Sequence, residues 1–309
     1  MGSDDTLGKV KDPVVAIVHW FKTRPPGTKA GLSGLGAVAL LLILWRTIKD
    51  HDTLFVLAEM AHFIGIGVLG YKLQKKKSVA GLSLQSQLLT ATFLAVRLFC
   101  SFMMEYDIHT VLDGLTLLAT LGVVYCMTAA DMKVTYQKEQ DIIKFYYVLV
   151  PCAVLALVAK PSTSHYFIFR IFWAFCVYLE AVSVFPQLRM MQKAKPPPPA
   201  TPIFFSFAFI VRWMGAARRA PQAPLVVERF TAHYVFALGL SRFLSCAHWI
   251  LQILEGNKYL LQALGSGLWP VMVLASEVVQ TFILADFCYY YVKSYAEGSG
   301  IVRLPAGIV

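Results

Sequence analysis

Charged residues are scarce in this chain of 309 residues, where Asp, Glu, Lys and Arg together make up 15% of the sequence. A soluble domain of this length carries about 25%. Hydrophobic residues make up 57% of the chain, and the mean hydropathy is +0.60. Apolarity on this scale excludes an ordinary soluble domain and predicts several membrane spans.

Signals for catalysis and for metal or cofactor binding are also missing. The sequence has no nucleophile beside a base, no metal-ligand spacing and no phosphate-binding loop, so it predicts neither an enzyme nor a cofactor or metal site. All six cysteines lie inside apolar runs without disulfide-framework spacing, and we interpret them as small core residues. Asp4 and Asp5 near the start, with no apolar core directly after them, argue against a cleavable signal peptide.

Seven apolar runs approach the ~20 residues that a helix needs to cross a bilayer. They are Thr53–Leu73, Leu84–Met104, Val111–Ala130, Ile142–Ala159, Tyr166–Phe185, Thr231–Leu254 and Leu268–Val292. The sequence therefore predicts an all-α polytopic membrane protein with seven core helices. We expect Ser86-Gln87 and Pro186-Gln187 to break helices at the starts of loops.

Lysine and arginine predict the orientation of these spans. The net charge is +10, and basic loops follow the first, third and fifth runs. We expect these loops to lie in the cytoplasm, and we do not interpret the positive charge as a sign of nucleic-acid binding. The loop with Glu105 and Asp107 and the loop with Lys160 then face the lumen, as does His51-Asp52, and the C-terminus is cytoplasmic.

The N-terminal part predicts an extension outside the core. Residues 12–23 form an amphipathic stretch too short to span, which suits the membrane surface. Ala30–Trp45 has marginal spanning length, and we expect it to add an eighth helix. We assign residues 1–50 to this extension and 51–309 to the core domain. Near 195–226, a stiff stretch that begins Lys195-Pro196 marks a cytoplasmic insertion.

One arginine recurs inside an apolar run in each half of the core. Arg97 lies in the string AVRLFCS and Arg242 in the similar string LSRFLSC. An intramembrane arginine is costly unless it is paired or lines a cavity, so both predict a functional site between the halves. Glu180 is a plausible partner for Arg242. Arg97 has no acid on its own run, and we expect it to bind the carboxylate of an anionic ligand.

The chain resembles the KDEL/HDEL receptor family, the ER lumen protein-retaining receptors, from about Leu54 to Pro305. The resemblance rests on ordered matches: Ala80 to Ser83, Phe93 to Arg97, Lys133 to Tyr136, Tyr178 to Glu180, Pro186 to Leu188, His233 to Gly239, Gln280-Thr281 and Asp286-Phe287. It is most similar to the divergent plant-type branch, which carries an N-terminal extension.

The resemblance implies a fold, a location and a ligand. The fold is a SWEET/PQ-loop-like core of two parallel three-helix repeats joined by a linker helix, here Ile142–Ala159, with the site at the repeat interface. The location is the membrane of the endoplasmic reticulum and Golgi. The implied partners are C-terminal retention-signal peptides of luminal proteins, the lipid bilayer and vesicle coat proteins, with peptides bound at low pH and released at neutral pH.

Seven residues match positions of the family's ligand cavity. They are the arginines Arg97 and Arg242, the buried Glu180, the pH-sensing His62, the aromatics Trp173 and Trp249, and the last-helix Asp286. Other cavity positions depart from the family. Phe55 and Gln252 stand where the resemblance implies arginines that bind acidic side chains of the peptide. The remaining differences are Leu98, Cys100, Arg170, Ser241, Ser245 and His248. The resemblance with these departures predicts an altered retention-signal cavity.

Each candidate also has a structural interpretation. Arg97, Arg242 and Glu180 can form ion pairs that only neutralise charge, and His62 can be a hydrogen-bonded packing residue rather than a proton switch. Trp173 and Trp249 can be packing or interface residues. At the level of function, two alternatives stay open. One is a carrier of small anionic solutes on the same fold, and the other is a trafficking protein that does not bind KDEL or HDEL tails.

Overall fold

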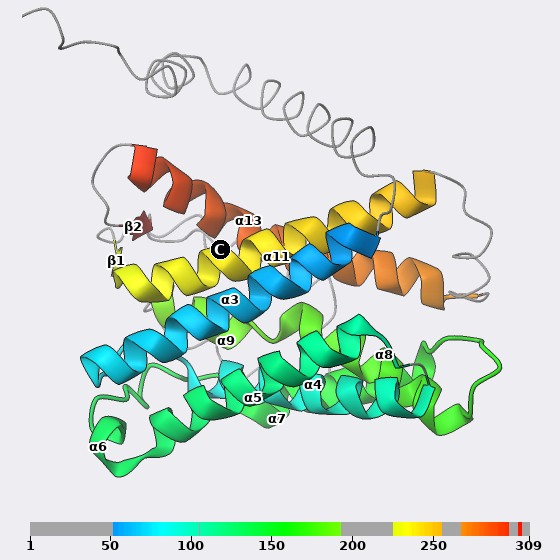
Figure 1. Cartoon of the computed structure of the whole chain (residues 1–309), viewed down its shortest axis with the longest axis horizontal. Coiled ribbons are helices and arrows are strands. Elements are labelled where there is room, and N and C mark those ends of the chain that lie inside the picture. Colours follow the sequence, from blue (N-terminus) through cyan, green and yellow to red (C-terminus); the bar gives the residue numbers. More distant parts are fainter. Residues whose placement is uncertain (1–51, 105, 193–224, 255–266, 297–301, 305–309) are drawn as a thin grey trace, which may run out of the picture.

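The computed structural model describes residues 52–104, 106–192, 225–254, 267–296 and 302–304. Its helices are α3 (Asp52–Lys76), α4 (Leu84–Met104), α5 (Ile108–Thr128), α6 (Ala130–Lys133), α7 (Phe145–Val158), α8 (Phe167–Val182), α9 (Phe185–Gln192), α11 (Arg229–Leu254) and α13 (Trp269–Ala296). The bundle in Figure 1 is thus almost wholly helical, as the composition predicts.

The seven predicted core helices are confirmed in the described residues. Six helices are long and apolar enough to span a membrane, with α8 and α9 counted as one span over Phe167–Met191. The seventh, α7, is apolar but has only 14 residues. It is about 21 Å long at 1.5 Å per residue, which is shorter than the ~30 Å hydrocarbon core. Helix α7 therefore differs from the full span expected over 142–159.

The packing of the helices reveals the internal repeat. In the first half α5 packs between α3 and α4, and in the second half α13 packs between α11 and α8. The third helix of each half therefore lies between the first and second. The halves meet where α3 packs on α11 and α4 on α8, while α7 packs against α8 and α4. This is the predicted pair of parallel repeats with a linker helix.

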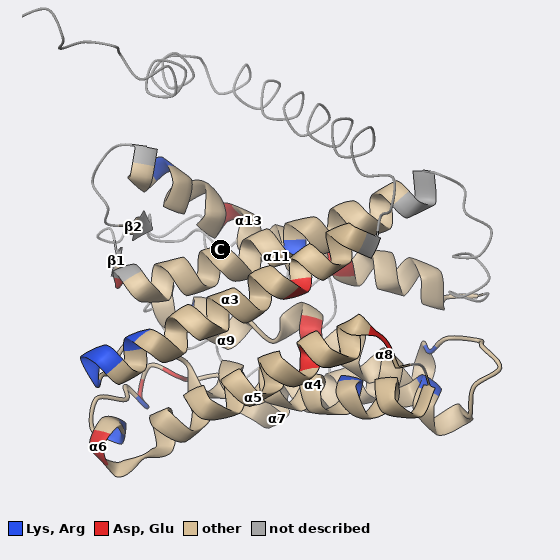
Figure 2. Cartoon of the chain, viewed as in Figure 1, with Lys and Arg blue, Asp and Glu red and all other residues tan. Residues whose placement is uncertain are grey.

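The two ends of the bundle differ in charge. Lysine residues lie where α3 ends and in α6, at the positions coloured blue in Figure 2. We call this the cytoplasmic end, following the positive-inside rule, and the end with the starts of α3, α5 and α13 the luminal end. At the luminal end, Asp107 caps α5 by accepting a hydrogen bond from the Thr110 amide (3.2 Å).

Two short strands close the cytoplasmic end, which an all-α prediction does not include. Strand β1 (Leu225–Val227) pairs antiparallel with β2 (Val302–Leu304), with Val226 opposite Arg303. Val227 and Val302 are buried in the hydrophobic core at this end. The end of the chain is thereby held against the segment that leads into α11.

The expected helix breaks at Ser86-Gln87 and Pro186-Gln187 are wrong. Both pairs lie in the first turn of a helix, α4 and α9 respectively, rather than at its end. Proline is tolerated there because the first amides of a helix have no partner within it. The amphipathic stretch 12–23, the helix expected over Ala30–Trp45 and most of the insertion at 195–226 lie outside the described residues.

Candidate functional site

The segment Ala80–Gln87 and the Pro186-Gln187 pair hold the cytoplasmic end together. The Gln187 amide accepts a hydrogen bond from the Ser83 backbone (2.8 Å) and donates one to the Gly81 carbonyl (2.8 Å). The Ser83 hydroxyl donates to Asp141 (2.7 Å), and so does the Tyr136 hydroxyl (2.7 Å). Burial, together with the neighbouring Asp141, raises the pKa of Tyr136 and keeps its hydroxyl a donor. These residues join two loops to the start of α9, and Ser86 of the same segment also lines the cavity described below.

Arg97 is held by two carboxylates. Its Nε donates to Asp113 (2.7 Å), Nη2 contacts the other oxygen of Asp113, and Nη1 donates to Glu180 (2.9 Å). The expectation that Arg97 lacks an acid partner is therefore wrong. Asp113 lies on α5, 16 residues along the chain, and its side chain is only 4% exposed. Together, the contacts to Asp113 and Glu180 use three of the five N–H donors of the guanidinium.

Arg242 shares Glu180 with Arg97 but has fewer partners. Its Nη1 contacts the second oxygen of Glu180, and no other ion pair of its guanidinium occurs within the described residues. Glu180 on α8 therefore bridges one arginine from each half of the core. The prediction that Glu180 partners Arg242 is confirmed, although the same carboxylate also binds Arg97.

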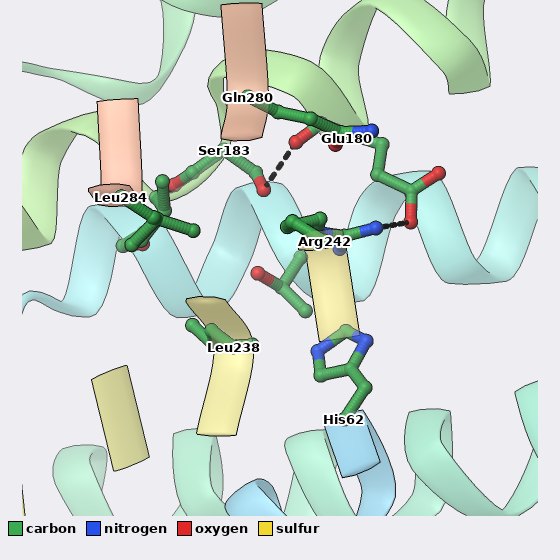
Figure 3. A pocket seen from close by; sticks show the side chains of 10 residues that line it. His62, Glu180, Ser183, Leu238, Arg242, Gln280 and Leu284 are labelled. Carbon is green, nitrogen blue, oxygen red and sulfur yellow. Dashed lines mark hydrogen bonds and ion pairs between the residues drawn. The ribbon is translucent and has the colours of Figure 1, made fainter. Parts of the chain in front are cut away.

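A small cavity lies between the halves beside Arg242. Its volume is about 10 Å³, enough for roughly one water molecule. Residues from both halves line it: His62, Ser86, Thr90, Glu180, Ser183, Val184, Leu238, Arg242, Gln280 and Leu284. In Figure 3 the His62 ring and Gln280 lie on opposite sides of Arg242. The structure therefore brings together Arg97, Arg242, Glu180 and His62 at the predicted interface.

The other three predicted site residues lie outside this cavity. Trp173 and Trp249 are half-buried and pack against the hydrophobic core, and Trp249 also contacts His248, with ring centroids 5.8 Å apart. Asp286 is half-buried on α13, beyond Leu284 toward the cytoplasmic end. None of the three lines the cavity in the described residues.

A second polar cluster surrounds Phe55 at the luminal end. The Phe55 ring lies 4.9 Å from the His109 ring and 5.4 Å from the His248 ring, measured between centroids. Nδ1 of His109 lies 2.8 Å from the Glu59 carboxylate. An uncharged ring therefore lies between two histidines at the position where the resemblance implies an arginine.

Sequence reasoning missed the acidic side of the site. Glu59, Asp113 and Glu277 are all buried, and Glu277 accepts a hydrogen bond from the Ser245 hydroxyl (3.1 Å). Each is an acid inside an apolar run, so the cost argument that singled out Arg97 applies to them equally. Carboxylates on α3, α5 and α13 therefore offset the positive charge of the arginines.

Comparison with known proteins identifies relatives over most of the chain. The family described as ER lumen protein retaining receptor matches residues 78–218. An ER lumen protein-retaining receptor of Caenorhabditis elegans is 34% identical over 246 residues, which cover 78% of this chain and 93% of the relative. This chain belongs to the ER lumen protein-retaining receptor family.

A mammalian and a plant relative have similar coverage. ER lumen protein-retaining receptor 3 of Mus musculus is 30% identical over 79% of this chain, and receptor A of Arabidopsis thaliana is 28% identical over 80%. The family assignment, together with six membrane-capable helices, makes the chain a multi-pass receptor of the endoplasmic reticulum and Golgi membranes. The expected resemblance is confirmed.

Proposed function

We propose that this receptor retrieves luminal proteins by binding their C-terminal tails, and that its cavity reads those tails differently from its relatives. The retrieval role follows from membership of the family. The altered reading is supported by the cluster around Phe55 at the luminal end of the bundle. There Phe55 lies between two histidine rings and offers no charge to an acidic side chain of the tail.

Arg242 is the anchor that we propose for the terminal carboxylate of the tail. Asp113 and Glu180 occupy Nε, Nη1 and Nη2 of Arg97, whereas only Nη1 of Arg242 contacts a carboxylate. A guanidinium can hold two carboxylates through different edges, so Arg242 can accept a ligand without releasing Glu180. The single observation that carries the proposal is that Arg97 contacts two carboxylates, whereas Arg242 contacts only one within the described residues.

The other proposed residues then have distinct roles. His62 faces Arg242 across the cavity and can contribute a ring nitrogen to the ligand. Arg97 holds Glu180 in place for Arg242 and adds positive charge behind it. The cavity has room for about one water molecule, so it must widen to admit a tail. Only in that wider cavity do we expect contacts between the tail and Trp173, Trp249 or Asp286.

Binding of synthetic tails to the purified full-length protein tests the proposal. We expect tails ending in HDEL or KDEL to bind at least tenfold (about 1.4 kcal/mol) more weakly than they bind the mouse relative measured in parallel. Substituting Phe55→Arg and Gln252→Arg together should recover part of that difference. Binding of HDEL tails as tight as that of the mouse relative would overturn the altered reading.

A carrier of small anionic solutes is the second candidate, because the cavity lies between two parallel repeats as in transporters of this architecture. A receptor holds its ligand from the luminal side alone, whereas a carrier exposes its site to both sides. Uptake of labelled anions, tested one by one in proteoliposomes, separates the two. Transport that Arg242→Met abolishes, without any binding of peptide tails, would favour the carrier.

A further inference from the structure

Glu277 differs from the other buried acids of the site because no cation is paired with it. Ion pairs within the described residues join Glu59 to His109, Asp113 to Arg97, and Glu180 to both arginines. Glu277, which is 7% exposed, accepts hydrogen bonds from the Ser245 hydroxyl and the Gln280 side chain, but it forms no ion pair within the described residues. A buried carboxylate without a cation is costly, which indicates a missing partner.

An unsatisfied acceptor lies one turn along the same helix. The Oε1 atom of Gln280 is buried and has no hydrogen-bond partner, while Gln280 itself is 3% exposed and lines the cavity. Glu277 and Gln280 are three residues apart on α13, so they share one face about 4.5 Å apart along the helix axis. The Oε1 atom of Gln280 therefore lacks a donor, and it lies on the same face as a carboxylate that has no ion-pair partner in the described residues.

The donor that suits these oxygens is a positively charged side chain of the ligand. Helix α13 starts at the luminal end, and from there Glu277 comes before Gln280, which lies beside Arg242 at the cavity. A tail that enters from the lumen and places its carboxylate on Arg242 therefore passes Glu277. An acidic side chain at that point meets a carboxylate, whereas a lysine or arginine side chain gains a charge-assisted hydrogen bond.

We propose that Glu277 and Gln280 select tails that carry a lysine or arginine side chain within the last two residues, next to the carboxylate held by Arg242. This inference rests on the proposed retrieval function and names the class of tail. The two acceptors attract a basic side chain of the tail and repel an acidic one. Both effects favour basic tails over acidic tails.

A set of fluorescent peptides tests the proposal on the purified full-length protein. The peptides share one sequence and differ only in the penultimate residue, which is Lys, Leu or Glu. An otherwise identical Leu peptide with an amidated C-terminus reports whether the terminal carboxylate is needed. We expect the Lys peptide to bind at least tenfold (about 1.4 kcal/mol) more tightly than the Glu peptide.

Two variants locate the preference. Glu277→Gln should reduce the preference for Lys over Glu at least fivefold, and Gln280→Leu should reduce it less. Glu228→Gln at the cytoplasmic end is the matched control and should leave it unchanged. Thermal unfolding of each variant shows that it is folded, and if Glu277→Gln does not fold, Gln280→Leu carries the test.

The outcomes separate this inference from the proposed function. Equal binding of Lys and Glu peptides, or a preference that survives in Glu277→Gln, overturns the role of Glu277. The proposed function stands even then if the Leu peptide binds with a free C-terminus and does not bind when its C-terminus is amidated. If no peptide binds, both proposals fail together.

Discussion

The two arginines of the repeat occupy matching places in the two halves but have different surroundings. Arg97 is enclosed by Asp113 and Glu180, with bidentate contacts to Asp113. Arg242 contacts Glu180 alone and borders the cavity. Both side chains are mostly buried, at 12% and 9% exposed. The first arginine is therefore tied into the fold, while the second retains donors for a ligand.

This difference shows that a buried charge does not by itself identify a binding residue. The cost of an intramembrane arginine can be offset by another helix of the same half, as Asp113 does for Arg97. Where the offset is incomplete, as at Arg242, a cavity accompanies it. The number of partners, rather than burial, separates the two roles.

The largest expected effect comes from removing the enclosed arginine. Arg97→Met leaves Asp113 buried without a cation, and breaking such a pair typically costs about 3–5 kcal/mol. Arg242→Met leaves Glu180 paired with Arg97, and we expect a loss of about 1–3 kcal/mol. Unfolding midpoints in detergent measure both variants.

Replacing both partners refines this test. Arg97→Met combined with Asp113→Leu removes the stranded carboxylate, so the double variant should be more stable than Arg97→Met alone. If Arg242→Met proves the more destabilising of the two single substitutions, the contrast between a structural and a ligand-binding arginine is wrong.

A smaller effect is expected from filling the close helix contact beside Arg242. A Cβ at Gly239 would lie 2.2 Å from Sγ of Cys288, so Gly239→Ala should cost about 1–3 kcal/mol and weaken peptide binding by displacing α13. Beside Asp113, a Cβ at Gly114 would come no closer than 3.9 Å to Leu98, so Gly114→Ala should be tolerated.

A suppressor checks the cause of the Gly239 effect. Cys288→Ala removes the sulfur atom and leaves the nearest contacts of the new Cβ at 3.6 and 3.9 Å. The double variant should recover much of the lost stability in the same unfolding assay. Equal losses of stability for Gly239→Ala and Gly114→Ala would show that the second half is no more tightly packed near Arg242 than the first half is near Arg97.

The smallest effect belongs to an ion pair outside both arginine sites. Burial opposes ionisation of Glu228, but contacts from Lys72 and Thr231 bring its pKa below the ordinary value. A lowered pKa stabilises the fold above the unfolded-state pKa, and this contribution is lost as pH falls through the folded-state pKa. Glu228→Gln should cost about 1 kcal/mol at neutral pH and reduce the acid sensitivity of unfolding.

This variant is also a control for the comparison. Peptide binding should not change, because Glu228 lies at the cytoplasmic end and contacts Lys72, Lys76 and Thr231. A change in peptide affinity as large as that of Arg242→Met would show that the effects are not local to the arginines.

The spans were predictable from the sequence, whereas the partners of the site were not. Run length and hydropathy locate a span within a few residues, as for Leu84–Met104, because crossing a bilayer requires a continuous apolar helix. The partner of Arg97 lies on another helix, so inspection of its own run could not find Asp113. Glu277 was visible as an acid in an apolar run, but only packing shows that it forms no ion pair within the part of the chain that the structure describes.

Helix ends were misjudged for a related reason. Pro186-Gln187 carries a helix-breaking residue, but proline is equally suited to the first turn, and sequence alone does not distinguish a start from a stop. The Gln187 side chain bonds to the segment at Gly81–Ser83, more than a hundred residues earlier, which is a tertiary contact.

The pairing of β1 with β2 affects how the protein can be labelled and shortened. Val302 is 1% exposed and lies against the same core as Val227, so deleting the residues from 302 onward would uncover apolar surface on the cytoplasmic side. A fluorescent fusion at the C-terminus will lie close to the segment that enters α11 and report on that neighbourhood. The elements that flank residues 193–224 have their own anchors, because Gln187 bonds to the Ser83 backbone and β1 pairs with β2.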